Sequence, residues 1–175
     1  RGIYVYAIAR WSITGARTME RLEFSARHVE SGDSLEADDA ERLANAAALS
    51  GRDWLSTHNM LDVAQAADVY ELLQEDLDDR FERFSALAEM ENLDRIDQMV
   101  SSLSDHLRNE QGRFNERIQT YRLSNDENKI RLIPAERGRL KRLEARFEER
   151  IAQLDLRRKL DKQNNFVSAG VIHVS

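Results

Sequence analysis

Five arginines in the second half of the chain follow the spacing of one helical face. They step by 3, 4, 4 and 7 residues: Arg139, Arg142, Arg146, Arg150 and Arg157. Such a stripe of cations could bind the phosphate backbone of a nucleic acid, in a manner that weakens with salt. Arginines beside a coiled-coil seam also pair with acids of the opposite helix. The acids available for such pairing are Asp105, Glu110 and Glu116, with Glu144, Glu148 and Glu149 on the same helix. Contact with nucleic acid or a partner, and internal pairing, are therefore alternatives.

The residues that most often carry catalysis form no motif in this chain. Its seven glycines are scattered, and none precedes a Lys-Ser or Lys-Thr pair, so the sequence holds no phosphate-binding P-loop. No serine lies in a Gly-x-Ser-x-Gly turn. The chain has no cysteine, which excludes a cysteine nucleophile, a disulfide and a zinc–thiolate site. We therefore predict that the chain is not an enzyme by itself and uses no cofactor.

Metal ligands do not converge in the sequence either. The four histidines, His28, His58, His106 and His173, lie far apart. The acidic pairs 38–39 and 78–79 fit the first turn of a helix or a solvated face more simply than a metal site. We expect no metal site, and a metal-dependent enzyme using acids of 36–50 and 60–90 is the least favoured hypothesis.

Aromatic residues gather near the N-terminus and offer a second surface to consider. They are Tyr4, Tyr6, Trp11, Phe24 and Trp54. Exposed aromatic rings on a sheet can stack against the bases of a single strand. The simpler interpretation is that they form the core of a small sheet, and we predict this core.

Composition and charge describe an extended, mainly helical molecule. Charged residues make up 33% of the 175 residues, above the roughly 25% of average globular proteins, which indicates helices largely bathed in solvent. The net charge is −6. Residues 1–104 contain 10 Lys and Arg against 21 Asp and Glu, whereas residues 105–163 contain 16 against 11, and the last twelve residues carry no charge. The chain is therefore electrically polar along its length.

No targeting or membrane segment is evident. No apolar run approaches the roughly 20 residues that span a bilayer, and nothing resembles a secretory leader. We expect a cytoplasmic protein without membrane contact, which the absence of cysteine suits. Because the sequence starts at Arg1 and enters an apolar run at once, we also expect an excised segment of a longer protein.

The N-terminal third reads as a small α/β base over residues 1–58. Aromatic and β-branched residues at 3–11 and alternating residues at 18–29 predict a β-hairpin. An alanine-rich helix is expected over 36–50, with Gly51 at its end. Trp54 and Leu55 are expected to pack that helix onto the hairpin.

Residues 59–163 read as a helical segment. From Leu93 the apolar residues follow a heptad pattern; they are Leu93, Ile96, Val100, Leu103, Leu107, Phe114, Ile118 and Tyr121. A break or bend is expected between Leu87 and Leu93, and a loop over 124–128. Pro134 fits the first turn of the next helix, which we expect to reach about residue 163. Segments 93–123 and 133–163 are equal in length and predict an antiparallel coiled-coil hairpin.

The final segment, 164–175, is predicted to close the fold. Residues 166–174 are uncharged and β-forming, and a lone edge strand would invite aggregation. We expect this strand to pair with the N-terminal hairpin. The predicted fold class is α+β, mainly α: a long antiparallel coiled-coil hairpin on a small sheet made by both ends of the chain.

This order of elements resembles the C-terminal region of RapA-type bacterial SWI/SNF ATPases and helicases, including helicase-like relatives in phage defence. The stretches that carry the resemblance are 2–10 and 21–26 in the predicted strands, 139–147 and 157–159 in the second helix, and 171–174 at the end. They cover most of the chain, as an arrangement of elements rather than a diagnostic motif.

The resemblance implies a non-catalytic accessory or regulatory module of an ATP-dependent DNA helicase or translocase. Its ATP-binding, ATP-hydrolysing lobes would lie N-terminal in the same parent chain and be its partners, together with DNA or RNA polymerase as candidates. No catalytic residue can be carried over, because the family's ATPase motifs have no counterpart here. The alternative hypothesis is a structural module that oligomerises or binds proteins through the coiled coil.

Overall fold

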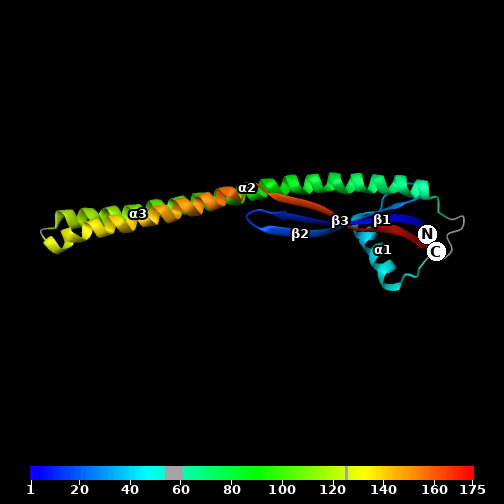
Figure 1. Ribbon diagram of the computed structural model, residues 1–175, viewed down its shortest axis with the longest axis horizontal. Coiled ribbons are helices and arrows are strands. Elements are labelled where there is room, and N and C mark those ends of the chain that lie inside the picture. Colours follow the sequence, from blue (N-terminus) through cyan, green and yellow to red (C-terminus); the bar gives the residue numbers. More distant parts are fainter. Residues whose placement is uncertain (54–60, 125) are drawn as a thin grey trace. The chain divides into compact units, whose positions relative to one another are not determined.

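A computed structural model describes residues 1–53, 61–124 and 126–175 of the chain (Figure 1). It is mainly helical, with one three-stranded antiparallel sheet in the order β2-β1-β3. The strands are β1 (Gly2–Thr14), β2 (Thr18–His28) and β3 (Asp161–Val174). The helices are α1 (Ala37–Ser50), α2 (Val63–Leu123) and α3 (Glu127–Leu156). The predicted hairpin and the return of the C-terminal strand to it are confirmed, because β1 pairs with β2 on one side and with β3 on the other.

One face of the sheet is buried because buried and less buried residues alternate along β1. Alternate residues of this strand are buried from Ile3 to Ile13, as expected when successive side chains point to opposite faces. Trp11, only 2% exposed, has its ring 5.6 Å from Phe81 and 5.5 Å from Phe84 of α2. The first part of α2 therefore covers this face of the sheet, and Figure 1 shows α1 on the opposite side.

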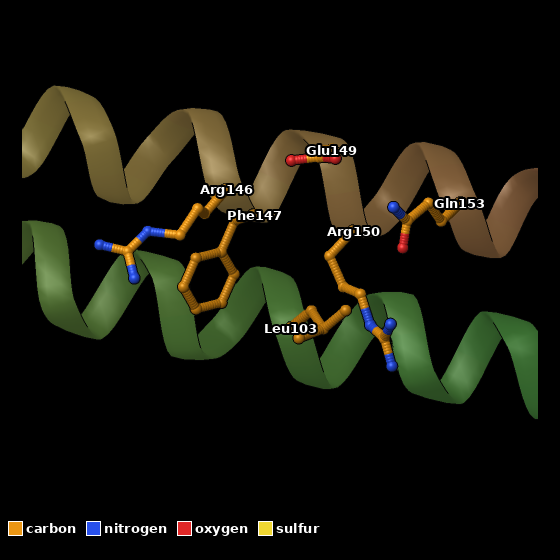
Figure 2. A pocket seen from close by; sticks show the side chains of 6 residues that line it. All are labelled: Leu103, Arg146, Phe147, Glu149, Arg150 and Gln153. Carbon is orange, nitrogen blue, oxygen red and sulfur yellow. The ribbon is translucent and has the colours of Figure 1, made fainter.

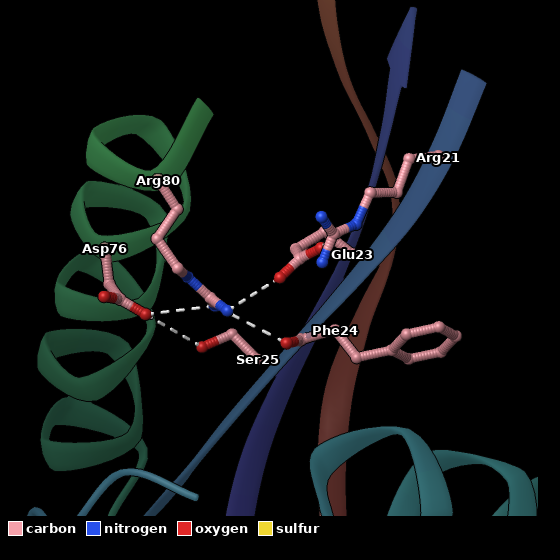
Figure 3. A network of polar contacts seen from close by, with 6 residues as sticks. All are labelled: Arg21, Glu23, Phe24, Ser25, Asp76 and Arg80. Atoms are coloured by element: carbon pink, nitrogen blue, oxygen red, sulfur yellow. Dashed lines mark hydrogen bonds and ion pairs between the residues drawn. The ribbon is translucent and has the colours of Figure 1, made fainter. Parts of the chain in front are cut away.

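Polar contacts join the same part of α2 to β2 (Figure 3). Arg80 donates to Glu23 Oε1 at 2.9 Å and to the carbonyl of Phe24 at 3.4 Å, and it pairs with Asp76 at 3.1 Å. Asp76 also accepts from Ser25 at 3.3 Å. The Glu23 side chain is only 6% exposed and receives a second ion pair, at 2.8 Å, from Arg21. A buried carboxylate needs such partners, because burial of an unpaired charge is costly.

The predicted helix over 36–50 is confirmed as α1. The helix carries Asp38 and Asp39 in its first turn, where acids interact favourably with the helix dipole. Gly51 follows its last residue and donates its backbone N–H to Ala47. The helix contacts β2 and buries its own Ala40 and Ala44. The predicted packing by Trp54 and Leu55 lies outside the described residues.

No break occurs between Leu87 and Leu93, because α2 is helical without interruption from Val63 to Leu123. Ala88, Glu89 and Met90 are strong helix formers and no proline or glycine interrupts them, so the departure from heptad spacing does not break the helix. The chain nevertheless divides into two compact units, and the boundary between them falls within α2. One unit contains residues 1–88 and 161–175, and the other contains residues 89–160. The segment predicted as one region over 59–163 thus contributes to both.

The second helix of the pair also differs from its prediction, at both ends. It begins at Glu127 instead of 133, because Asp126 accepts a hydrogen bond from the N–H of Asn128 at 2.9 Å and caps the first turn. Pro134 consequently lies inside α3 rather than in its first turn. The helix ends at Leu156 rather than near 163, since residues from Asp161 pair with β1. Pairing to a neighbouring strand overrides local helix preference there.

Within the second unit, the far half of α2 and α3 make contacts in antiparallel order. The sequence separation between contacting residues of the two helices increases with their distance from the loop that joins the helices. Arg117 contacts Glu136, Gln111 donates to Glu144 at 2.8 Å, and the ring of His106 lies 5.4 Å from that of Phe147. The short connection at 124–126 joins the helices. The structure thus brings the residues around the arginine stripe beside α2.

Candidate functional site

The five predicted arginines lie where the sequence placed them, on and just beyond α3. Arg139, Arg142, Arg146 and Arg150 belong to the helix, and Arg157 occupies the position after its last residue. All five are exposed. At about 100° per residue, the four helical positions fall within roughly a quarter of the helix circumference. We refer to these five residues as the arginine stripe.

Four of the five stripe residues make no ion pair within the described part of the chain. Arg139 alone is paired, with Glu136 of its own helix at 2.8 Å. Two of the acids considered as partners for the stripe pair along their own helix instead: Asp105 with Arg108 at 3.2 Å and Glu110 with Arg113 at 2.6 Å. Side chains three residues apart on one helix are within reach of each other, and among the described residues no stripe arginine forms an ion pair with an acid of α2.

A shallow groove of about 350 Å³ lies along the middle of the stripe (Figure 2). Its lining comes from α2 at one position and from α3 at the others: Leu103, Arg146, Phe147, Glu149, Arg150 and Gln153. Phe147 and Arg150 reach from α3 toward α2, where Leu103 meets them (Figure 2). The groove thus combines an apolar floor with two guanidinium groups and one carboxylate.

Three polar residues hold α3 against α2 on either side of the groove, and sequence reasoning missed them. Glu136, 6% exposed at its side chain, receives Arg117 from α2 at 3.2 Å as well as Arg139. Asn92 donates to the carbonyl of Arg157 at 2.9 Å and to that of Arg158 at 3.2 Å. These bonds satisfy carbonyls that the end of a helix leaves without partners. The position of Glu136 three residues before Arg139 could have indicated from the sequence that these two residues form an ion pair.

Arg158 closes the same end of α3 by binding two carboxylates. It lies 2.7 Å from Asp155 in the last turn of α3 and 2.7 Å from Asp97 on α2. Hydrogen bonds that Arg158 donates to Asp155 and, with a smaller effect, to Asp97 raise its pKa above the ordinary value. Arg158 therefore stays charged and links the end of α3 to α2 through Asp97. Its neighbour Arg157 belongs to the arginine stripe.

The aromatic residues considered for base stacking divide between the core and one sheet face. Trp11 is core, as predicted, because it is buried beneath α2 with Phe81 and Phe84. Tyr4 makes an edge contact with His28, at 5.0 Å between ring centroids, and the Tyr6 hydroxyl lies 3.4 Å from that of Ser168. Tyr4, Tyr6 and Phe24 are each part-buried. Trp54 lies outside the described residues.

No three histidine or acidic side chains of the described ranges are placed so that they could hold a metal ion. His58 lies outside these ranges. Asp78, one of the acids considered as a ligand, accepts a hydrogen bond from Asn164 at 2.7 Å instead. Among the described helices, none is both long and apolar enough to cross a membrane.

Comparison with known proteins adds no relative: no family model matches the sequence, and no curated protein or solved structure matches it either. The arginine stripe combines exposure to solvent with four guanidinium groups that make no ion pair among the described residues.

Proposed function

We propose that this chain is a non-catalytic accessory module of an ATP-dependent DNA helicase or translocase of SWI/SNF type, and that its arginine stripe contacts DNA phosphates. The observation that carries the proposal is the set of four stripe arginines without an ion pair in the described part of the chain. A helix face with several free guanidinium groups binds phosphates by releasing their counterions. The proposal assigns ATP hydrolysis to lobes outside this chain.

The ion pairs near both ends of α3 support this role. Glu136 with Arg117 and Arg158 with Asp97 restrain α3 relative to α2, so the stripe is presented as a rigid row. Arginine suits such contacts because its planar guanidinium donates two parallel hydrogen bonds to phosphate. We also propose that α2 from Leu93 onward and α3 form an antiparallel coiled coil, for which the ordered contacts between them are the support.

The test is the salt dependence of binding to duplex DNA, with a matched pair of variants. Replacing Arg146 and Arg150 by glutamine removes two stripe charges. Replacing Arg137 and Lys141 by glutamine removes two exposed charges from the opposite side of α3, neither of which makes an ion pair with another described residue. Each lost phosphate contact lowers the slope of log affinity against log salt by about 0.9. We expect a slope change of about 1.8 for the first variant and little change for the second.

Equal losses in both variants would show that only net charge matters and would contradict a stripe-specific contact. Binding that is the same at low and high salt would contradict phosphate contact altogether. Binding to an acidic protein in place of DNA would mean that the arginine stripe contacts a partner protein. Addition of ATP is expected to produce no phosphate release from this chain alone.

A second candidate function, a structural module that oligomerises through the coiled coil, is favoured by incomplete burial between the helices. The apolar residues facing the α2–α3 junction are only half-buried, including Leu103, Leu107, Leu143, Phe147 and Ile151. A further helix against the groove would bury them more fully. Replacement of Phe147 by lysine is expected to abolish an association of this kind, as measured by light scattering, whereas the stripe variants would not.

A further inference from the structure

The two edges of the sheet differ sharply in charge. The order β2-β1-β3 leaves β2 and β3 at the edges. Four of the 11 residues of β2 are charged: Glu20, Arg21, Glu23 and Arg27. In β3, the charges stop at Lys162, and residues 163–175 contain no Asp, Glu, Lys or Arg. Charged residues on an edge strand hinder pairing with another chain, so β2 is protected and β3 is not.

Apolar side chains of β3 are also exposed on the face that α2 covers elsewhere. Phe166 is paired with Ala9 and Val171 with Val5, and cross-strand partners point to the same face. Ala9 and Val5 are 0% and 3% exposed, whereas Phe166 and Val171 are 39% and 36% exposed. Val167, beside the register shift in this strand, is 58% exposed. The layer over β1 therefore ends before β3.

We infer that β3 is a self-association edge, on which the β3 strand of a second copy of this chain pairs in antiparallel orientation around a two-fold axis. The pairing would extend each three-stranded sheet into one continuous sheet. An antiparallel pair of identical strands is self-complementary, since residue i of one copy meets residue j of the other and residue j of the first copy meets residue i of the second. Because residues 163–175 carry no charge, this pairing brings no like charges together. A charged strand from another partner would find no opposite charge there.

The size of the edge predicts a reversible dimer. Residues 164–174 extend about 36 Å at roughly 3.3 Å per residue, and a strip about 10 Å deep gives roughly 360 Å² for each copy. A total near 700 Å² belongs to the small interfaces of transient complexes. We therefore expect a monomer at low concentration and a dimer at about 100 μM, with backbone hydrogen bonds as the main attraction.

The first experiment measures mass by sedimentation equilibrium over a range of concentrations. The unaltered chain is expected to rise from 20.3 kDa toward twice that value. Val167→Lys places a charge on the exposed edge and is expected to weaken association at least tenfold. Leu22→Lys makes the same kind of change at an exposed residue of β2, 54% exposed, and is expected to leave association unchanged. Circular dichroism with the wild-type thermal midpoint checks that both variants fold.

The second experiment uses the absence of cysteine in the natural sequence. Single cysteines are placed in turn at Ser168, Ala169 and Val171, and at Leu22 as a control. Only positions close to a two-fold axis bring two identical Cα atoms within the roughly 4.4–6.8 Å that a disulfide requires. We expect cross-linking that is strong at one β3 position, weaker at its neighbours and absent at Leu22.

Some results would overturn the inference. A chain that stays monomeric at several hundred micromolar has no self-association edge. A dimer that survives Val167→Lys but is lost in Phe147→Lys is held by the helices instead. Uniform cross-linking along β3 would indicate random collision and not a defined pairing.

Discussion

Replacement of Arg80 by methionine tests whether the ion pairs between α2 and β2 stabilise the first unit. Among the residues drawn in Figure 3, only Arg80 contacts all three of Glu23, Asp76 and the Phe24 carbonyl. Methionine retains the apolar stem of the side chain and removes its charge. The Glu23 carboxylate, 6% exposed, then depends on Arg21, whose side chain is 54% exposed.

The expected loss follows from burial. Removing one partner of a buried ion pair costs about 3–5 kcal/mol, because the remaining charge stays buried. Arg21 compensates part of this loss, which gives an expected destabilisation of about 2–3 kcal/mol. For a chain of this length, each kcal/mol lowers the melting temperature by about 2–4 °C. Arg80→Met should therefore melt about 4–12 °C below the unaltered chain.

A double-mutant cycle separates the pair from the rest of the side chain. Glu23→Gln removes the charge that Arg80 meets, so the double variant should be less destabilised than the sum of the single variants by at least about 1 kcal/mol. Arg83→Met is the control, since Arg83 is exposed on the same helix and makes no ion pair in the described part of the chain. It should change stability by less than about 0.5 kcal/mol. Urea unfolding followed by circular dichroism measures all four variants. Additive effects, or a cost for Arg80→Met as small as that of the control, would refute the reasoning.

Four further substitutions test other parts of the fold by the same urea assay. Trp11→Ala should cost about 3–5 kcal/mol, because it removes the ring that packs against Phe81 and leaves a cavity beneath α2; a cost below about 1 kcal/mol would place the ring outside the core. Gly112→Ala and Gly138→Ala should each stabilise by about 0.5–1 kcal/mol, since both glycines are helical and an added Cβ meets nothing within 4 Å; destabilisation would indicate a neighbour at these sites. Pro134→Ala should stabilise by about 1–3 kcal/mol, because alanine restores a hydrogen bond inside α3. A neutral or destabilising result would mean that the helix begins at Pro134, where proline is favourable.

Local pattern was sufficient to predict several elements. Alternation of apolar residues gave the two strands of the hairpin, and the alanine-rich run before Gly51 gave α1. The uncharged β-forming end of the chain was assigned correctly to the same sheet. In each case side-chain periodicity or composition reports directly on which face is buried.

The ends of the long helices could not be predicted in this way. Residues 161–165 are polar and resemble a helix end, yet they extend because β1 continues to Thr14 and supplies hydrogen-bond partners as far as Asp161. Heptad irregularity near Leu87 suggested a break in the helix, but strong helix formers continue α2 through this segment. The cap at Asp126 starts α3 at Glu127, well before residue 133 where the proline suggested its start.

The sequence by itself determined that a row of arginines lies on one face of a helix, because helical spacing depends only on position along the chain. Only the tertiary structure decided which of these arginines are free, since that depends on which acids come within reach. Glu136 takes Arg139, while Asp105 and Glu110 pair along their own helix. The same distinction holds for β3, whose strand character is local, whereas its bare edge follows from the order of strands in the sheet.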